Sequence, residues 1–262
     1  MKPPLSGLAV AVTRPRAQAA GFAARVREAG ATPILLPTLA IEPVDVDEAA
    51  RARLVPDAFD WTIYTSANAV ESSLLQLPRP VRTRVAAIGR GTARALADHG
   101  VAVHAMPTST SDSEGLLALE PFLAAAGRRI LILKGEGGRT LLREELERRG
   151  ARVVTAEVYR RVPALPDPDA LAALGKACED GTAVVAATSA ESLAALLEAV
   201  PDQRLPRLRD AVLLVPGARV AAAARTRGWR GPLLVARSAE DAAMAEALLD
   251  GLRPGDAPTP AC

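Results

Sequence analysis

The chain has 262 residues, 49% of them hydrophobic, and a formal net charge of only +2, which is the composition of an ordinary folded globular protein. Aromatic residues make up 3% of the chain, which argues against the stacking platforms of single-strand nucleic-acid binders. Basic residues occur singly or in pairs, so the sequence predicts neither a nucleic-acid partner nor a membrane-binding patch.

The first half of the chain alternates short apolar runs with segments of helical periodicity. The expected strands cover residues 8–12, 34–36, 61–64, 85–88 and 101–105. The expected helices cover residues 22–29, 69–77 and 113–123, with a further helix that ends at Gly100. An alternation of this kind predicts α/β architecture, in which parallel sheets carry helices on both faces.

The second half repeats this series of elements at a nearly constant offset. Its expected strands cover residues 130–133, 153–154, 183–187, 212–215 and 233–236, and its helices follow at 141–146, 192–199, before residue 228 and at 239–252. Gly30 and Gly150, which each end a helix, lie 120 residues apart, and Thr65 and Thr188, which each precede a serine, lie 123 residues apart. Four matched units in the same order predict an internal duplication.

Two extended, Pro-containing segments, residues 37–46 and 155–168, interrupt this pattern in the middle of each copy. If the chain leaves one lobe at the first segment and returns at the second, the two lobes interleave. We therefore predict one lobe of residues 1–37 and 168–253 and another of residues 46–155. Residues 38–45 and 156–167 would be connector strands, and residues 254–262 a disordered tail.

The turns between strands and helices hold the candidate binding residues. Ligands of open α/β sheets bind at the carboxyl ends of the strands, where helix N-termini favour anions. These turns are residues 13–16, 65–68, 89–92, 134–139, 188–191 and 216–219, and most of them combine small or hydroxyl residues with a basic side chain. A ligand with many carboxylates would suit them.

Each of these residues also has a purely structural interpretation. Ser66 and Ser189 fit helix N-caps, and the glycines fit positions of positive φ. Arg14 and Arg219 fit ordinary solvated side chains. Pro216 further removes an N–H donor from its turn, so the two lobes need not bind carboxylates equally.

The standard cofactor and nucleophile motifs do not occur in the sequence. Arg94 and Thr140 stand where GxGxxG requires glycine, and neither GxxxxGK[ST] nor GxSxG occurs. His99 and His104, the two histidines, do not lie next to a strand-to-helix turn. The sequence therefore predicts a site without metal or nucleotide.

Neither cysteines nor apolar runs indicate export or a membrane. Cys178 and Cys262 form no CxxC pair, which argues against a disulfide framework and a zinc site. The N-terminus has only a short apolar stretch before Thr13, and no run approaches the roughly 18 apolar residues of a membrane span. We expect a cytoplasmic protein without membrane contact.

Several motifs, taken together in their order, resemble the uroporphyrinogen-III synthase family over roughly residues 7–250. They are TRP at residues 13–15, DWTIYTSANAV at 60–70, IGRGTA at 88–93, the glycine turn at 134–139 and EVYRR at 157–161. The resemblance implies two flavodoxin/Rossmann-like parallel-sheet domains, interleaved in sequence and joined by a two-stranded antiparallel connector, with a cleft between them. It also implies an enzyme that needs no cofactor or metal.

The resemblance further implies a lyase of tetrapyrrole (haem) biosynthesis that cyclises hydroxymethylbilane to uroporphyrinogen III, with loss of water and inversion of ring D. The catalytic tyrosine of the family maps to Tyr159, which would help the hydroxyl group depart as water. A phenol is protonated at neutral pH and can donate a proton. The expected substrate-binding residues are Arg14, Thr65, Ser66, Ala67, Asn68, Gly89, Thr92, Gly135, Arg139, Thr188, Ser189, Ala190 and Arg219.

Other interpretations remain open at this stage. Tyr159 fits a packing role in a connector, and the whole chain fits a two-lobed cytoplasmic binding or sensor protein that closes on a polycarboxylate without chemistry. A nucleotide-using Rossmann enzyme is disfavoured by the broken glycine motifs. Because both lobes belong to one chain, we expect a monomer, with a possible transient contact to hydroxymethylbilane synthase.

Overall fold

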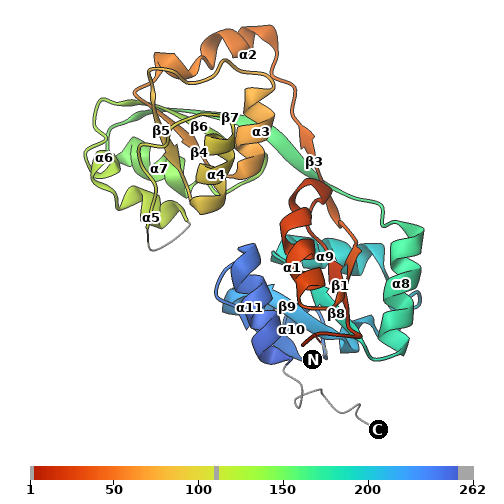
Figure 1. The fold of residues 1–262 in the computed structure, drawn as a ribbon. Coiled ribbons are helices and arrows are strands. Elements are labelled where there is room, and N and C mark those ends of the chain that lie inside the picture. The colour runs from red at the N-terminus through yellow and green to blue at the C-terminus, as the bar shows by residue number, and fades with distance from the viewer. Residues whose placement is uncertain (1–2, 109–111, 253–262) are drawn as a thin grey trace. The chain divides into compact units, whose positions relative to one another are not determined.

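The computed structural model describes residues 3–108 and 112–252 (Figure 1). The predicted disordered tail, residues 254–262, lies outside these residues. The chain divides into two compact units, one that runs up to Ala40 and resumes at Val162, and one that comprises Ile41–Arg161. The chain therefore crosses twice between the units, once at residues 40–41 and once at residues 161–162.

The first unit contains a five-stranded sheet in the order β10-β9-β8-β1-β2, in which all neighbouring strands are parallel. Its strands are β1 (Ala9–Val12), β2 (Thr32–Leu35), β8 (Ala183–Ala186), β9 (Val212–Pro216) and β10 (Leu233–Ala236). Its helices are α1 (Ala20–Glu28), α8 (Pro168–Glu179), α9 (Ala190–Ala199), α10 (Gly217–Thr226) and α11 (Asp241–Gly251), with short 3-10 turns at Arg16–Gln18 and Leu208–Asp210.

Alternate residues of these strands pack on opposite faces of the sheet. Leu213 and Val215 of β9 join the core beneath α8, α9 and α10, whereas Val212 and Leu214 join the core beneath α1 and α11. Both faces are covered by helices, and this is why the strands are continuous apolar runs rather than alternating ones.

The second unit contains a five-stranded sheet in the order β3-β7-β6-β4-β5. Its strands are β3 (Leu39–Pro43), β4 (Trp61–Tyr64), β5 (Arg84–Ala87), β6 (Arg129–Gly135) and β7 (Arg152–Pro163). Its helices are α2 (Glu48–Arg53), α3 (Ala67–Leu74), α4 (Arg90–Asp98), α5 (Ser113–Leu117), α6 (Glu120–Leu123) and α7 (Leu141–Arg148), with a 3-10 turn at Pro56–Ala58. One core lies under α3 and α4, and another under α5, α6 and α7.

Equivalent strands of the two copies occupy equivalent places in the two sheets. The order β9-β8-β1-β2 in the first unit corresponds to β5-β4-β6-β7 in the second, so each sheet takes its strands from both copies. This agreement supports the internal duplication and shows the mixed α/β architecture that the sequence predicts.

Two expected elements differ from the structure, and two helices were not expected. Residues 101–105 form no strand, but only an isolated bridge from Ala105 to Ala86. The reason is His104, whose Nδ1 accepts the N–H of Val85 at 3.1 Å, so a side chain takes the place of a strand carbonyl. The helix expected over residues 113–123 is divided into α5 and α6. Helices α2 and α8 lie where the sequence predicts no helix, and α8 begins directly after the predicted connector ends at residue 167.

The connector prediction concerns β3 and β7, which are neighbours in the sheet. Residue numbers rise along one segment as they fall along the other, because Val44 N–H donates to Val158 and the preceding Glu42 pairs with Arg160 at 2.9 Å. The two segments are therefore antiparallel where they meet in the second unit.

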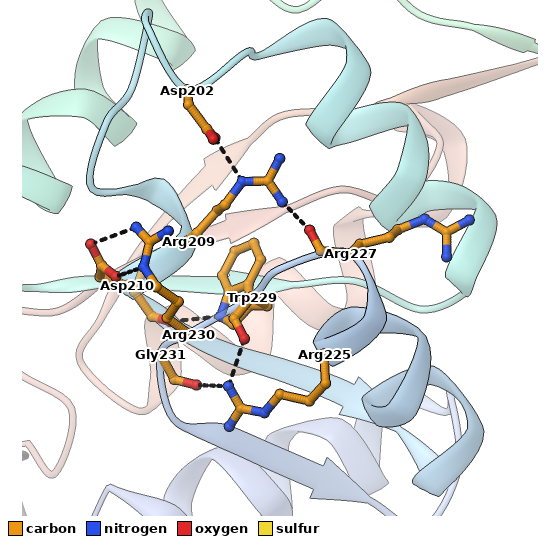
Figure 2. A network of polar contacts seen from close by, with 9 residues as sticks. Asp202, Arg209, Asp210, Arg225, Arg227, Trp229, Arg230 and Gly231 are labelled. Atoms are coloured by element: carbon orange, nitrogen blue, oxygen red, sulfur yellow. Dashed lines mark hydrogen bonds and ion pairs between the residues drawn. The ribbon is translucent and has the colours of Figure 1, made fainter.

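A network of arginines closes the amino ends of β9 and β10 in the first unit (Figure 2). Arg225 donates to the carbonyl oxygens of Trp229 and Gly231 at 2.8 and 2.9 Å, and the Trp229 indole N–H donates to Ala211 at 2.9 Å. Arg230 forms a two-pronged ion pair with Asp210. These arginines serve the packing of a turn, which accounts for much of the basic character of this part of the sequence.

In the described residues, no helix is long and apolar enough to cross a membrane.

Candidate functional site

Each sheet has two adjacent central strands after which the chain runs in opposite directions, toward opposite edges of the sheet. This change of direction, the switch point, lies between β1 and β8 in the first unit and between β4 and β6 in the second. Thr13 donates through its N–H and its Oγ1 to Ala186 at 3.2 and 3.0 Å, and Thr65 donates in the same way to Leu133 at 3.1 Å from both atoms. Ligands of open α/β sheets bind outside such points.

Two serines begin the helices that follow these points. The Ser66 Oγ accepts the N–H of Ala69 at 3.1 Å at the start of α3, and the Ser189 Oγ accepts the N–H of Ser192 at 3.0 Å at the start of α9. Ser189 and Ser192 form a reciprocal capping box. Both serines are therefore N-caps, as their structural interpretation predicts, and Ser66 has a further contact with Tyr159.

A bulge in β7 controls where Tyr159 points. Lys134 of β6 faces Glu157, but the next residue, Gly135, faces Tyr159, so β7 contains one extra residue, Val158, at this place. An extra residue reverses the alternation of side chains along a strand. Val158 and Tyr159 are consequently both buried, with 0% and 1% of their surface exposed.

Gly135 provides the space that the Tyr159 ring needs. A Cβ atom on residue 135 would lie 2.5 Å from Cζ and 2.8 Å from Oη of Tyr159. Gly135 has no positive φ, whereas Gly137 and Gly217 have φ of +69° and +74°. The expectation that the glycines of the strand-to-helix turns supply positive φ therefore holds for Gly137 and Gly217 but not for Gly89, Gly91, Gly135 or Gly138.

Two side chains hold the Tyr159 hydroxyl group. The Ser66 Oγ donates to the Tyr159 Oη at 3.1 Å, and the Arg161 Nη2 donates to it at 3.0 Å. An arginine can only donate, and in this arrangement the Ser66 hydroxyl also donates to Tyr159, so the Tyr159 oxygen is the acceptor in both contacts. The phenolic O–H of Tyr159 is the donor in neither of these two contacts. The sequence did not single out Arg161 as a site residue.

The glycine turn between β6 and α7 is held by charged side chains. Lys134 Nζ donates to Gly138 O at 2.8 Å and lies 3.6 Å from the Glu157 carboxylate. The same carboxylate accepts the N–H of Gly137 at 3.3 Å. Arg139 at the end of the turn pairs with Glu114 at 3.2 Å, so its guanidinium reaches toward α5.

Arg14 has internal partners. Its guanidinium pairs with Asp241 and donates to Ala239 O at 2.6 Å, at the start of α11. Burial lowers the pKa of Arg14, and the Asp241 carboxylate opposes this effect. The interpretation of Arg14 as an ordinary solvated side chain is therefore wrong. Its role in substrate binding stays a prediction.

The remaining candidates lie at helix starts. Ala67 and Asn68 begin α3, and Ala190 begins α9, each after its capping serine. The buried Thr92 lies in the first turn of α4, for which Gly89 is the N-cap residue. Arg219 is exposed in the first turn of α10, and Thr188 is half-buried before α9. Each stands at the carboxyl edge of its own sheet, and its contact with substrate stays a prediction.

Residues 3–108 and 112–252 contain no group of three or more His, Cys, Asp or Glu side chains that could hold a metal ion.

Comparison with known proteins adds independent information. A family model described as uroporphyrinogen-III synthase HemD matches residues 20–246. The uroporphyrinogen-III synthase of Synechococcus elongatus is 37% identical over 186 residues, which cover 66% of this chain and 69% of that protein. That of Salmonella typhimurium is 36% identical over 197 residues, covering 72% and 78%.

Solved structures agree with these sequence relatives. A mutant uroporphyrinogen III synthase from Thermus thermophilus superposes with a TM-score of 0.56 at 26% identity, over 93% of this chain and 97% of that chain. The uroporphyrinogen-III synthetase of Helicobacter pylori gives a TM-score of 0.60 over 93% and 98% at 18% identity, which supports the fold alone. By its family model and its relatives, the chain belongs to the uroporphyrinogen-III synthase HemD family.

Proposed function

We propose that this chain cyclises hydroxymethylbilane to uroporphyrinogen III, with loss of water and inversion of ring D, as a lyase of haem biosynthesis. The observation that carries the proposal is that the Tyr159 hydroxyl oxygen accepts hydrogen bonds from Ser66 and Arg161. Its own proton would be donated to the substrate. Tyr159 is the residue that the family resemblance assigns to catalysis, and the family membership of the chain supports the reaction.

In the proposed step, Tyr159 donates its proton to the hydroxyl group of the hydroxymethyl carbon. The C–O bond breaks, its electron pair stays with the oxygen, and water leaves behind an azafulvene cation and a tyrosine phenolate. The substituted carbon of ring D attacks the cation to form a spiro intermediate, which fragments and closes again. The ring carbon that forms the last bond loses its proton, which returns to the phenolate.

The rest of the site would serve to position a flexible substrate. Carboxylates of the bilane would bind at helix N-termini, where backbone N–H groups and the helix dipole favour anions. Thr65, Ser66 and Asn68 stand at such a terminus in the second unit, and Thr188, Ser189 and Ala190 at its equivalent in the first. Arg219 is exposed at the start of α10 and would add a positive charge.

A binding or sensor protein without chemistry is not favoured, because the named relatives and solved neighbours are synthases. We further propose that the protein works as a monomer in the cytoplasm and receives its substrate through a transient contact with hydroxymethylbilane synthase. Sedimentation over a range of concentrations tests the first of these points, and a mass that rises with concentration would contradict it.

The reaction is tested by generating hydroxymethylbilane in situ with its synthase, adding this protein, oxidising the products and separating the isomers. Spontaneous closure gives the type I isomer, so a type III product supports the proposal. Type I alone, at protein concentrations that bind the bilane, would support the sensor interpretation instead.

A further inference from the structure

We infer that Arg161 is a positioning residue for Tyr159, which holds the phenolic oxygen and stabilises the negative charge that this oxygen gains when its proton leaves. The inference rests on the proposed function, because it concerns the step in which Tyr159 donates its proton. It assigns a role to a side chain that ends the EVYRR motif but is not among the expected site residues.

The regular alternation of β7 after Val158 brings the two side chains together. Tyr159 and Arg161 are two residues apart on one strand, so both project from the same face, while Arg160 between them projects from the other. The contacts agree with this alternation, since the Arg161 Nη2 lies 3.0 Å from the Tyr159 Oη and Arg160 pairs with Glu42 of β3 at 2.9 Å.

The geometry suits a charge on the phenolic oxygen better than on the ring. The Arg161 Cζ lies 5.4 Å from the centroid of the Tyr159 ring, near the outer limit of about 6 Å for cation–π contacts. Its Nη2 is within hydrogen-bonding distance of the oxygen itself. A charge-assisted hydrogen bond strengthens when its acceptor becomes an anion. Arg161 therefore interacts more strongly with the phenolate than with the phenol.

Ser66 supports the same oxygen from another side. Its position is fixed by its role as the N-cap of α3, where it accepts the Ala69 N–H at 3.1 Å. The hydroxyl of Ser66 and the guanidinium of Arg161 thus form two donors that are in place before the charge develops. Donors arranged in this way lower the energy of a charged state without reorganising.

The test compares kcat and KM of Arg161→Met in the wild-type and Tyr159→Phe backgrounds, with hydroxymethylbilane generated in situ. In the wild-type background kcat should fall about 10-fold to 100-fold, somewhat less than for a fully buried oxyanion donor, with KM changed by less than about twofold. In the Tyr159→Phe background Arg161→Met should change kcat by less than about twofold, because the oxygen that it serves is missing.

Arg160→Met is the matched control, since it removes an equal charge from the next residue of the strand but faces Glu42. Its kcat should stay within about twofold of wild type, and a similar loss in both variants would contradict the inference. Arg161→Lys keeps the charge but not the planar guanidinium, so it should recover part of the lost kcat. This variant also provides the measurement if Arg161→Met does not fold.

Three further results would overturn the inference. An equal fall of kcat in both backgrounds would mean that Arg161 acts without Tyr159, and a change confined to KM would assign Arg161 to substrate binding. An unchanged kcat in Tyr159→Phe would remove the step that Arg161 serves. The proposed function fails separately, when wild-type protein makes no type III isomer.

Discussion

The Tyr159 ring occupies the space that a Cβ atom on residue 135 would fill, with Cζ 2.5 Å from that position. The two residues lie opposite each other on β7 and β6, at the place where an extra residue shifts the register. The sequence identifies both residues as candidates, and the structure explains them as one feature. Glycine on one strand permits the tyrosine on the other to turn inward.

Gly135→Ala should displace the Tyr159 ring and lower kcat. The added methyl group meets a ring in a packed core, so we expect a loss of about 1–3 kcal/mol in the free energy of unfolding. The kcat should fall at least about 10-fold, because a small misplacement of a catalytic group is costly. Steady-state kinetics and urea unfolding measure both effects.

Gly91→Ala is the control for this substitution. Gly91 lies in the first turn of α4, has no positive φ, and a Cβ atom there would meet nothing within 4 Å. Alanine in a helix is favoured over glycine, so stability should be unchanged or rise by up to about 1 kcal/mol. Equal losses in the two variants would contradict the account of Gly135.

Tyr159→Phe should lower kcat by about 100-fold or more, while KM changes by only a few fold, because the variant loses proton donation but keeps the ring. Tyr64→Phe is the control, since Tyr64 is the other tyrosine of the chain and is buried in the same core. Burial raises the pKa of Tyr64 to about 12, so it is a poor proton donor. If Tyr159→Phe keeps the wild-type kcat, Tyr159 is a packing residue.

Asp57 should make the stability of the second unit depend on pH. Its Oδ1 accepts the N–H groups of Val81, Arg82 and Thr83 at 2.9, 2.8 and 3.1 Å. These backbone hydrogen bonds, that from Arg82 first, lower the pKa of Asp57. A lowered pKa in the folded state stabilises the fold above the ordinary carboxyl pKa, and this contribution is lost as the pH falls through the lowered value.

Urea unfolding of wild type and Asp57→Asn at several pH values tests this dependence. Near pH 7 the variant should be less stable by about 1 kcal/mol, because its amide oxygen is a weaker acceptor than a carboxylate. The difference should shrink as the pH falls below about 4, where the unfolded carboxyl group is protonated. A difference that stays constant with pH would show that the charge of Asp57 is unimportant.

Cys178 should be unreactive in the folded protein. It is buried in α8, and burial raises the pKa of its thiol to about 11. At pH 8 only about one thiol in a thousand would then be the reactive thiolate. In a Cys262→Ser background, a disulfide reagent should react at least about 100-fold more slowly with native than with denatured protein. Similar rates in both states would contradict the buried environment.

The fold was largely predictable because most strands are apolar runs that end at polar turns. The failure at residues 101–105 has a local cause, since the His104 imidazole binds the edge of β5 in place of a backbone carbonyl. Helix α8 was missed although Asp167 caps it and Pro168 opens it, a common start signal. The Pro-containing sequence before it was interpreted as a connector that ends at residue 167, and no helix was predicted directly after it.

The site was less predictable than the fold. The motifs indicate Tyr159, Ser66 and Gly135, but the bulge at Val158 depends on how β7 pairs with β6, which no local pattern encodes. Without that shift, strand alternation would place Tyr159 on the opposite face from Val158. Arg161 was missed for a different reason, because its two-residue spacing from Tyr159 indicates a shared face of the strand but not a hydrogen bond between the two side chains.

The most direct test of the central claim is the isomer composition of the product. It is measured in parallel for wild type and Tyr159→Phe with freshly generated hydroxymethylbilane. The account predicts type III product with wild type, and mostly type I product from spontaneous closure with the variant over the same time. Type I product from the wild-type protein, in the same proportion as without protein, would contradict it.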